Sequence, residues 1–292
     1  MDIGAHVSSA GGISKSIERA SAIGAESMQI FVSSPRTWAF KPPSDQEVKS
    51  FHEKLIDSAI SSVFIHGTYL INLGGESDLV AKSVVILKQH MVVAGRIGSQ
   101  GVIFHSGSHK GKGFDGVFKQ ASDALKEVLE NSPDDVPLII ENCAGMGAQI
   151  GSSFGELGNL LREVDHPNLK ICLDTEHAFA AGYDIANREK LRDCMEEFDR
   201  EIGLDKLVVV HANDSKVVLG GGVDRHENIG DGYIGISGFE NIIAHEAFEC
   251  VPFLLEVPGI HKKGPDIENM TRLKAIRNTV GSKMGCDIVK ES

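Results

Sequence analysis

Short apolar runs alternate along the chain with longer segments in which apolar residues recur every three or four positions. This alternation is typical of βα units, in which each run forms a buried parallel strand and each longer segment a helix. Eight such repeats favour closure into a single (β/α)8 TIM barrel over an open doubly wound α/β sheet. The predicted strands cover residues 2–6, 27–32, 62–66, 101–105, 136–141, 169–174, 207–212 and 252–256. The predicted helices cover residues 13–23, 45–59, 78–96, 116–131, 154–164, 188–202, 239–245 and 266–280.

The chain has 292 residues, which fits one barrel domain over residues 1–283 followed by a loosely held, flexible tail over residues 284–292. No Pro/Gly/Ser-rich linker divides it. No apolar stretch reaches the roughly 18 residues of a membrane span, and the first residues lack the features of a secretory signal, so no membrane association is expected. The five cysteines are scattered and form no CxxC pair, which favours a reducing, cytoplasmic location.

Metal-binding side chains stand at the ends of six of the predicted strands. His66, for example, closes Ser-Val-Phe-Ile-His, and Glu141 closes Pro-Leu-Ile-Ile-Glu. The carboxyl ends of barrel strands lie on one face, so these side chains should converge there and form an active site. A single histidine would be better explained as a packed core or surface residue, but that explanation does not account for six strands at once. The six residues are His66, His105, Glu141, Asp174, His211 and Glu256.

Three more candidate ligands lie in the connecting segments. His177 follows Asp174 by three residues, and Asp224 and His226 are separated by one residue, which in an extended segment places both on the same side. A catalytic ion needs only about three protein ligands, so nine candidates predict two or three ions with a shared carboxylate. Imidazoles and carboxylates without thiolates suit zinc or manganese. His6, at another strand end, is left open as a ligand or a supporting residue.

The formal net charge of −12 argues against a protein that binds nucleic acid through its overall charge. Local binding stays open, because basic residues recur in the segments that follow strands, and His109 and Arg225 there are candidate substrate contacts. The glycine-rich stretch at 107–113 lacks the spacing of a phosphate-binding loop, and no GxGxxG follows the first strand, so no nucleotide cofactor is expected. The basic residues of these segments include Arg36, Lys41, Lys110, Lys112, Lys216, Arg225, Lys262 and Lys263.

Around these positions the chain resembles the endonuclease IV family of abasic-site DNA repair enzymes over nearly its whole length. The shared strings are long and far more specific than the spacings above. The resemblance implies a (β/α)8 barrel with a trinuclear zinc cluster, which agrees with the pattern of strand ends. The strings are Gly4–Ser8, His66–Leu73, Glu141–Gly145, Asp174–Asp184, His211–Lys216 and Asp224–Gly230.

The activity that the resemblance implies is a phosphodiester hydrolase, an AP endonuclease of the deoxyribonuclease IV type. It would cut duplex DNA 5′ to an abasic site, leave a 3′ hydroxyl and a 5′ deoxyribose phosphate, and clean damaged 3′ ends. The enzyme would act as a monomer with three zinc ions, and manganese is an alternative at one site. In this scheme Glu141 and Glu256 are the catalytic residues.

The resemblance also assigns the ligands and the DNA contacts. Arg36, Tyr69 and Leu70 match residues that enter the duplex at the lesion, whereas the local sequence by itself would place them in an ordinary packed loop. The first zinc would be held by His66, His105 and Glu141, the second by Glu141, Asp174, His211 and Glu256, and the third by His177, Asp224 and His226.

One departure from the family pattern bears on the metal centre. Glu176 stands in the Asp-Thr-x-His string where a small residue, often cysteine, is usual. Its carboxylate could tune the cluster or face solvent. Two other functions stay open: a metal-dependent sugar isomerase or epimerase of the same barrel class, which needs only one or two ions, and a catalytically inactive protein that binds damaged DNA.

Overall fold

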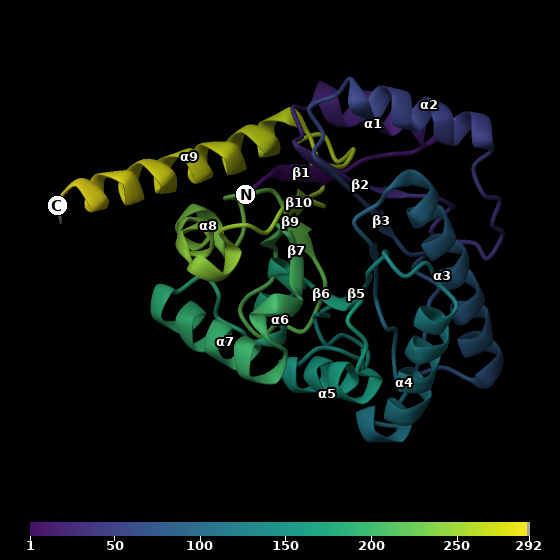
Figure 1. Cartoon of the computed structure of the whole chain (residues 1–292). Helices are drawn as coiled ribbons and strands as arrows, with labels where there is room; N and C mark the ends of the chain where they lie inside the picture. Colours follow the sequence, from purple (N-terminus) through teal and green to yellow (C-terminus); the bar gives the residue numbers. More distant parts are fainter. Residues whose placement is uncertain (291–292) are drawn as a thin grey trace.

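The computed structural model describes residues 1–290, with side chains described through residue 281. Eight parallel strands pair edge to edge and close into a barrel, in the order β1-β10-β7-β6-β5-β4-β3-β2 (Figure 1). The predicted (β/α)8 barrel is therefore confirmed. Its strands are β1 (Ile3–His6), β2 (Ser27–Phe31), β3 (Ser62–His66), β4 (Val102–Phe104), β5 (Leu138–Glu141), β6 (Leu169–Asp174), β7 (Leu207–His211) and β10 (Phe253–Leu255).

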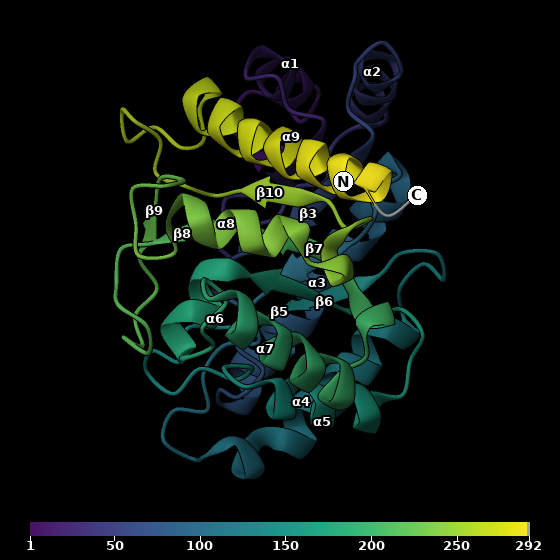
Figure 2. The same cartoon turned by 90° about the vertical axis from the view of Figure 1, so that its left-hand side faces the viewer.

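Helices surround the barrel and pack against one another largely in chain order, as Figures 1 and 2 show. Near the end of the chain, Arg277 in the last helix donates hydrogen bonds to the carbonyl of Met1 and to Glu26. The last helix therefore packs beside the first strand of the barrel. The helices are α1 (Ser14–Ala22), α2 (Asp45–Ile56), α3 (Ser77–Ile97), α4 (Phe114–Glu130), α5 (Phe154–Val164), α6 (Thr175–Ala181), α7 (Arg188–Glu201), α8 (Gly235–Ala244) and α9 (Ile267–Lys290), with 3₁₀ turns at Leu204–Lys206 and Glu246–Phe248.

Polar side chains and a glycine set several helix boundaries. The hydroxyls of Ser44 and Ser153 accept hydrogen bonds from backbone N–H groups in the first turns of α2 and α5. These bonds satisfy donors that have no partner inside the helix. At the other end of α3, Gly98 adopts a left-handed conformation with φ of 67°, which glycine reaches without steric cost.

Successive side chains of each strand point to opposite faces, and the apolar side chains on the two faces form two separate clusters. The main core lies between the strands and the helices, and it includes Val63 and Ile65 of β3. A second, separate cluster draws one side chain from each of six strands. Successive side chains of a strand point to opposite faces, so the residue two positions later points the same way. In all six strands that residue is a candidate ligand. The six apolar residues are Phe64, Ile103, Ile139, Cys172, Val209 and Leu254.

Three features differ from the sequence-based expectations. The segment after β6 forms the short helix α6, and Asp214–Ser215 (β8) pairs antiparallel with His226–Glu227 (β9). Helix α9 continues through Lys290, so the expected tail over residues 284–292 begins inside a helix, whereas residues 291 and 292 lie outside the described part. The division into a domain over 1–283 and a tail stays a prediction.

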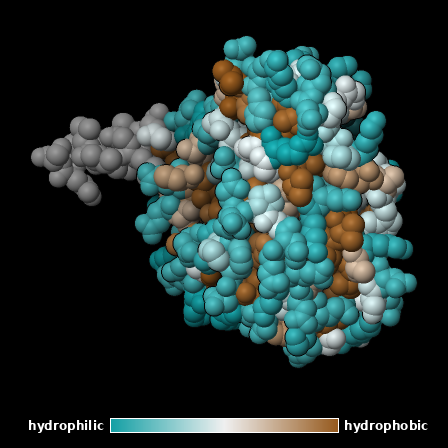
Figure 3. Space-filling model, turned by 45° about the vertical axis from the view of Figure 1, so that its right-hand side comes forward, coloured by the Kyte–Doolittle hydropathy of each residue, from teal (hydrophilic) through white to brown (hydrophobic). Residues whose placement is uncertain are grey.

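Over the described part of the chain, no helix has the length and apolar character needed to cross a bilayer. On the face drawn in Figure 3, hydrophilic residues predominate and hydrophobic ones form small scattered patches. The cytoplasmic location inferred from the cysteines stays a prediction.

Candidate metal centre

The predicted ligands converge at the carboxyl ends of the strands. Eight of the nine, together with Glu176, fall into groups whose ligand atoms lie within 4.8 Å of one another, whereas Asp224 belongs to none of these groups. The first two groups match the sets expected from the resemblance, and the third includes two residues that were not expected there. The groups are His66, His105 and Glu141; Glu141, Asp174, His211 and Glu256; and Asp174, Glu176, His177 and His226.

Glu141 joins the first two groups through its two carboxylate oxygens. Oε2 lies 3.2 Å from Nε2 of His66 and 3.5 Å from Nε2 of His105. Oε1 lies 3.0 Å from Nδ1 of His211 and 3.2 Å from Nδ1 of His177. The side chain is fully buried. Glu141 therefore has the position of the shared carboxylate that the count of nine ligands predicted.

In His66 and in His211, one ring nitrogen donates a hydrogen bond and the other faces Glu141. Nδ1 of His66 donates to the carbonyl of Gly67 at 2.7 Å, and Nε2 of His211 donates to Oε1 of Gln29 at 2.9 Å. In a neutral ring the other nitrogen then carries a lone pair. That nitrogen faces Glu141 in both residues, and in His211 it also lies 3.3 Å from Glu256 Oε2.

His177 and His226 repeat this arrangement. Nδ1 of His177 donates to the carbonyl of Asn142 at 2.9 Å, and Nδ1 of His226 donates to the carbonyl of Glu256 at 3.4 Å. Their Nε2 atoms both face Asp224, at 3.3 and 3.5 Å. The expected trio of His177, Asp224 and His226 is thus brought together.

These residues fit a cluster of cations. The lone pair of a histidine nitrogen that faces a carboxylate is repelled unless a positive charge lies between the two groups. In addition, a histidine that binds a metal through one ring nitrogen usually donates the N–H of its other nitrogen to a carbonyl or carboxylate. Moreover, Nε2 of His226 is buried and has no hydrogen-bond partner. A buried polar atom without a partner is rare and calls for an explanation, such as an ion. The lack of a thiolate in these three groups of described residues suits a catalytic rather than a structural centre.

Two asparagines hold the ligands in place from behind. Asn213 donates through Nδ2 to Asp174 Oδ2 at 2.7 Å and accepts through Oδ1 from the backbone N–H of Glu256 at 2.9 Å. Asn142 accepts from the backbone N–H of Asp174 at 2.6 Å. Each asparagine follows a ligand strand closely, so the same strand ends that supply ligands also supply their supports.

Gln29 connects the second group to the first strands of the barrel. It accepts from His211 through Oε1 and donates through Nε2 to Glu256 Oε1 at 2.6 Å. His6 Nδ1 lies 2.8 Å from the same oxygen of Glu256. One oxygen of Glu256 is thereby held, whereas the other faces the ligand groups. His6, which the sequence left open, contacts a ligand as a supporting residue.

Neighbouring histidines lower the pKa values of three carboxylates of the centre, Glu141, Glu256 and Asp224. Burial alone would raise the pKa of Glu141, but His105 and His211 hold it well below its usual range. Burial likewise opposes the ionisation of Glu256, yet the neighbouring His211 and His6 lower its pKa. The pKa of Asp224 falls to about 2 because His177 more than offsets the effect of burial.

The same charges act on the histidines. Burial works against protonation of His177, but Asp174 and the other carboxylates raise its pKa well above the usual value. Burial is also outweighed at His211, where Cys172 and Glu256 raise the pKa. The carboxylates therefore draw positive charge into the centre, and divalent cations would supply it.

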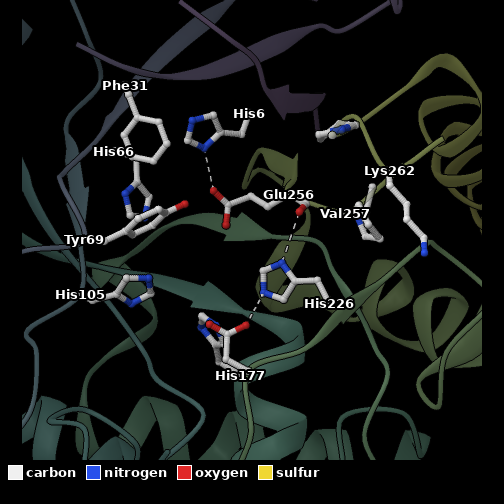
Figure 4. A pocket seen from close by; sticks show the side chains of 14 residues that line it. His6, Phe31, His66, Tyr69, His105, His177, His226, Glu256, Val257 and Lys262 are labelled. Atoms are coloured by element: carbon white, nitrogen blue, oxygen red, sulfur yellow. Dashed lines mark hydrogen bonds and ion pairs between the residues drawn. The ribbon is translucent and has the colours of Figure 1, made fainter. Parts of the chain in front are cut away.

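A cavity of about 490 Å³ opens above the ligands. Figure 4 shows its labelled side chains arranged around the opening, with His6 and His226 directed toward Glu256. Tyr69, Phe31 and Lys262 form other parts of the wall. A polar cavity of this size accommodates a small ligand or one nucleotide unit.

The five expected DNA contacts occupy different positions. Tyr69 lines the cavity, is 57% exposed, and packs edge-on against Phe31 with ring centroids 5.4 Å apart. Arg36 is exposed on a loop that touches Tyr69, since the Pro35 carbonyl accepts from the Tyr69 backbone N–H. Leu70 is half-buried beside it.

His109 and Arg225 make local contacts. His109 accepts through Nδ1 from the backbone N–H of Gly113, and the exposed Arg225 donates to the carbonyl of Asp224. Neither of them lines the cavity. Their contact with DNA, like that of the other three residues, stays a prediction.

Gln29 and Glu176 are members of the centre that the sequence alone did not assign to it. A fully buried glutamine among the apolar residues Met28, Ile30 and Phe31 was the available signal for Gln29. Glu176 was noted only as a departure from a family pattern.

Three comparisons place the chain among known proteins. Residues 17–276 match the family model described as xylose isomerase-like TIM barrel. A Halothermothrix orenii protein named probable endonuclease 4 is 39% identical over 276 residues, which cover 94% of this chain and 99% of that protein. The crystal structure of endonuclease IV from Thermus thermophilus superposes with a TM-score of 0.85 at 33% identity, covering 96% of this chain and 100% of that one. A D-tagatose 3-epimerase-like protein shares the fold alone, with a TM-score of 0.74 at 19% identity over 97% of this chain and all of that one.

Proposed function

This chain belongs to the endonuclease IV family, within the xylose isomerase-like TIM barrels, and is a DNA-cleaving hydrolase of abasic-site repair; from that membership and the geometry of its site we propose a specific reaction. It hydrolyses the phosphodiester 5′ to an abasic site in duplex DNA and leaves a 3′ hydroxyl and a 5′ deoxyribose phosphate. The same chemistry removes blocking groups from 3′ ends. We expect the enzyme to act as a monomer.

The observation that carries this proposal is the convergence of three ligand groups beneath one cavity. Glu141 connects the first two groups, and Asp224 lies within 3.5 Å of His177 and His226 of the third. The first group would hold one zinc ion, the second another, and the third group a third ion, for which manganese is an alternative. When bound, the ions supply Lewis-acid chemistry: they activate water as a nucleophile and neutralise the charge that develops on the phosphate.

The residues of the chain orient the reacting groups. Glu256 lines the cavity, and because His6 and Gln29 hold Oε1, its other oxygen is directed toward the ligand groups. An ionised carboxylate there accepts a hydrogen bond from the attacking water and fixes its direction. Glu141, buried below, keeps the two groups at a constant separation. Both residues are therefore the proposed catalytic carboxylates.

Selection of the lesion follows from the shape and walls of the cavity. A nucleotide without its base is easily unstacked and turned out of the duplex. A cavity of about 490 Å³ fits such a sugar phosphate. Tyr69 offers an exposed aromatic ring at the wall, and Lys262 offers a cation for a phosphate. Arg36 and Leu70, next to Tyr69, would fill the space that the displaced nucleotide leaves.

A sugar epimerase of the same barrel class is the other candidate. It needs one or two ions, so the assembled trio of His177, Asp224 and His226 would have no purpose in it. The epimerase-like neighbour is only 19% identical and speaks for the fold alone.

The test is incision of an end-labelled duplex that carries one tetrahydrofuran abasic analogue, without added magnesium. This analogue cannot undergo β-elimination, so any cut is hydrolytic. We expect one cut 5′ to the lesion, with a 3′ end that a polymerase extends. Glu163→Gln, which changes an exposed carboxylate of α5 far from the centre, serves as the control and should cut normally. An uncut duplex despite full metal loading would refute the proposal, and tight lesion binding in that case would indicate the inactive binder.

A further inference from the structure

Glu176 is the carboxylate for which the proposed centre has no role. It lies in the first turn of α6, between Asp174 and His177, and is fully buried. The alternative that it faces solvent is therefore excluded. A buried carboxylate is costly unless it is paired with hydrogen-bond donors or a cation.

Only one of its two oxygens has such a partner. The backbone N–H of Arg225 donates to Oε1 at 3.1 Å, and the Ser215 hydroxyl lies 3.2 Å from the same oxygen. Oε2 is buried and makes no hydrogen bond with the described residues. The side chain is therefore anchored on one side and carries an unpartnered oxygen on the other.

Glu176 belongs to a group in which another residue, His226, also has a buried atom without a hydrogen-bond partner. Ligand atoms of Asp174, Glu176, His177 and His226 all lie within 4.8 Å of one another, and Nε2 of His226 likewise makes no hydrogen bond. Metal–ligand bonds of about 2.0–2.2 Å separate opposite ligands of one ion by roughly 4 Å. Glu176 and His226, each with one buried polar atom that makes no hydrogen bond, thus belong to a group compact enough for one ion.

We infer that Glu176 is a ligand of the third ion, through Oε2, in addition to His177, Asp224 and His226. The inference rests on the metal centre of the proposed function. It adds an anionic oxygen at a position where the family usually has a small residue. A site with more carboxylate oxygens suits a harder ion with more than four ligands. The third site of this chain should therefore favour manganese, relative to zinc, more than a site without Glu176.

A purely structural role is distinguishable from this one. Both polar contacts of the anchored side go to Oε1, and the amide oxygen of a glutamine can accept them equally well. Glu176→Gln therefore keeps the anchor between α6 and residue 225 but replaces the proposed anionic ligand with a neutral amide. Glu176→Ser provides a second variant, with a small side chain of the kind usual at this position.

The experiment uses the full chain, stripped of metal and titrated with Mn²⁺ and then with Co²⁺. We measure bound ions per chain, the dissociation constant of the weakest site, and the visible absorption of bound Co²⁺, which intensifies as its coordination number falls. Loss of a supporting contact alone costs about 10–100-fold in metal affinity, so loss of a ligand should weaken the third Mn²⁺ at least tenfold. The first two ions should bind as before, and the Co²⁺ absorption should intensify.

Three ions bound with unchanged affinity and an unchanged Co²⁺ spectrum in both variants would overturn the role of Glu176. Glu163→Gln is the matched control, since it removes a carboxylate from the surface of α5 and should bind metal as the unaltered chain does. An unaltered chain that binds fewer than three ions would overturn the trinuclear centre itself, and the two failures are thereby distinguished.

Discussion

Substitution of Gln29 tests whether this residue holds His211 and Glu256 in place. Its amide oxygen is the acceptor for Nε2–H of His211, and its amide nitrogen donates to Glu256. Gln29→Leu keeps the approximate volume of the side chain but removes both polar contacts. His211 then has a buried N–H without an acceptor, whereas Glu256 retains His6.

The expected magnitudes follow from these contacts. A buried donor left without its partner costs about 1–3 kcal/mol of the free energy of unfolding. Loss of the group that orients a ligating histidine weakens metal binding by about 10–100-fold, because the ring is no longer held in one tautomer and one direction. We therefore expect a lower urea midpoint in the metal-free protein and a separate loss of affinity at the second ion.

Urea unfolding in chelator and a zinc titration measure the two effects separately. Met28→Leu is the control, because Met28 neighbours Gln29 in β2 but packs into the main core on the opposite face. This volume-conserving exchange should cost less than about 1.5 kcal/mol and leave metal affinity unchanged. A zinc dissociation constant of Gln29→Leu within about twofold of that of the unaltered chain would represent a change far smaller than the loss expected for an orienting group. In that case Gln29 does not orient His211.

Three further predictions concern catalysis, recognition and pH. Glu141→Gln should reduce incision of the tetrahydrofuran duplex by roughly 10³-fold, equivalent to several kcal/mol, while a gel-shift assay still detects duplex binding; normal cutting would contradict its assignment. Tyr69→Ala should weaken binding to the lesion duplex by roughly tenfold, within the roughly 1–3 kcal/mol of an aromatic–base contact, and should leave binding to undamaged duplex nearly unchanged; equal losses on both duplexes would argue against a contact at the lesion. The pKa values of His177 and His211 are raised, so a metal ion must displace their protons. Zinc affinity should therefore increase as pH rises toward those values, and isothermal titration in two buffers should detect the released protons. For the same reason, the stability that these protons give the metal-free fold is present at low pH and lost as pH rises through the raised pKa values.

The strands and their ligands could be predicted because two local signals coincide. An apolar run identifies a buried strand, and parity along that strand determines which residues share a face. Phe64 and His66, or Ile139 and Glu141, are two positions apart, so each ligand sits directly above an apolar residue of the inner cluster. The exact strand ends shifted by a residue or two, which did not matter because parity was preserved.

Other parts of the site could not be predicted because their roles depend on contacts between distant segments. Gln29 acquires its role only when His211 and Glu256 arrive, 182 and 227 residues later. Similarly, the pairing of β8 with β9 involves two residues on each strand, too few for any periodic pattern. Glu176 was conspicuous in the sequence, but its burial and its unpartnered oxygen belong to the three-dimensional structure.

The pairing of β10 with both β1 and β7 has a consequence for the order in which the enzyme matures. The first ligand group is complete once β5 has been synthesised, but the second requires Glu256, which follows the last strand of the barrel. During translation, a chain grows at about 5–20 residues per second and the ribosome must add roughly a hundred residues between these two stages. A prematurely terminated chain would expose at most a partial set of ligands to the cell's metal pool. The complete set of proposed ligands therefore comes together only when the first and last strands of the barrel meet.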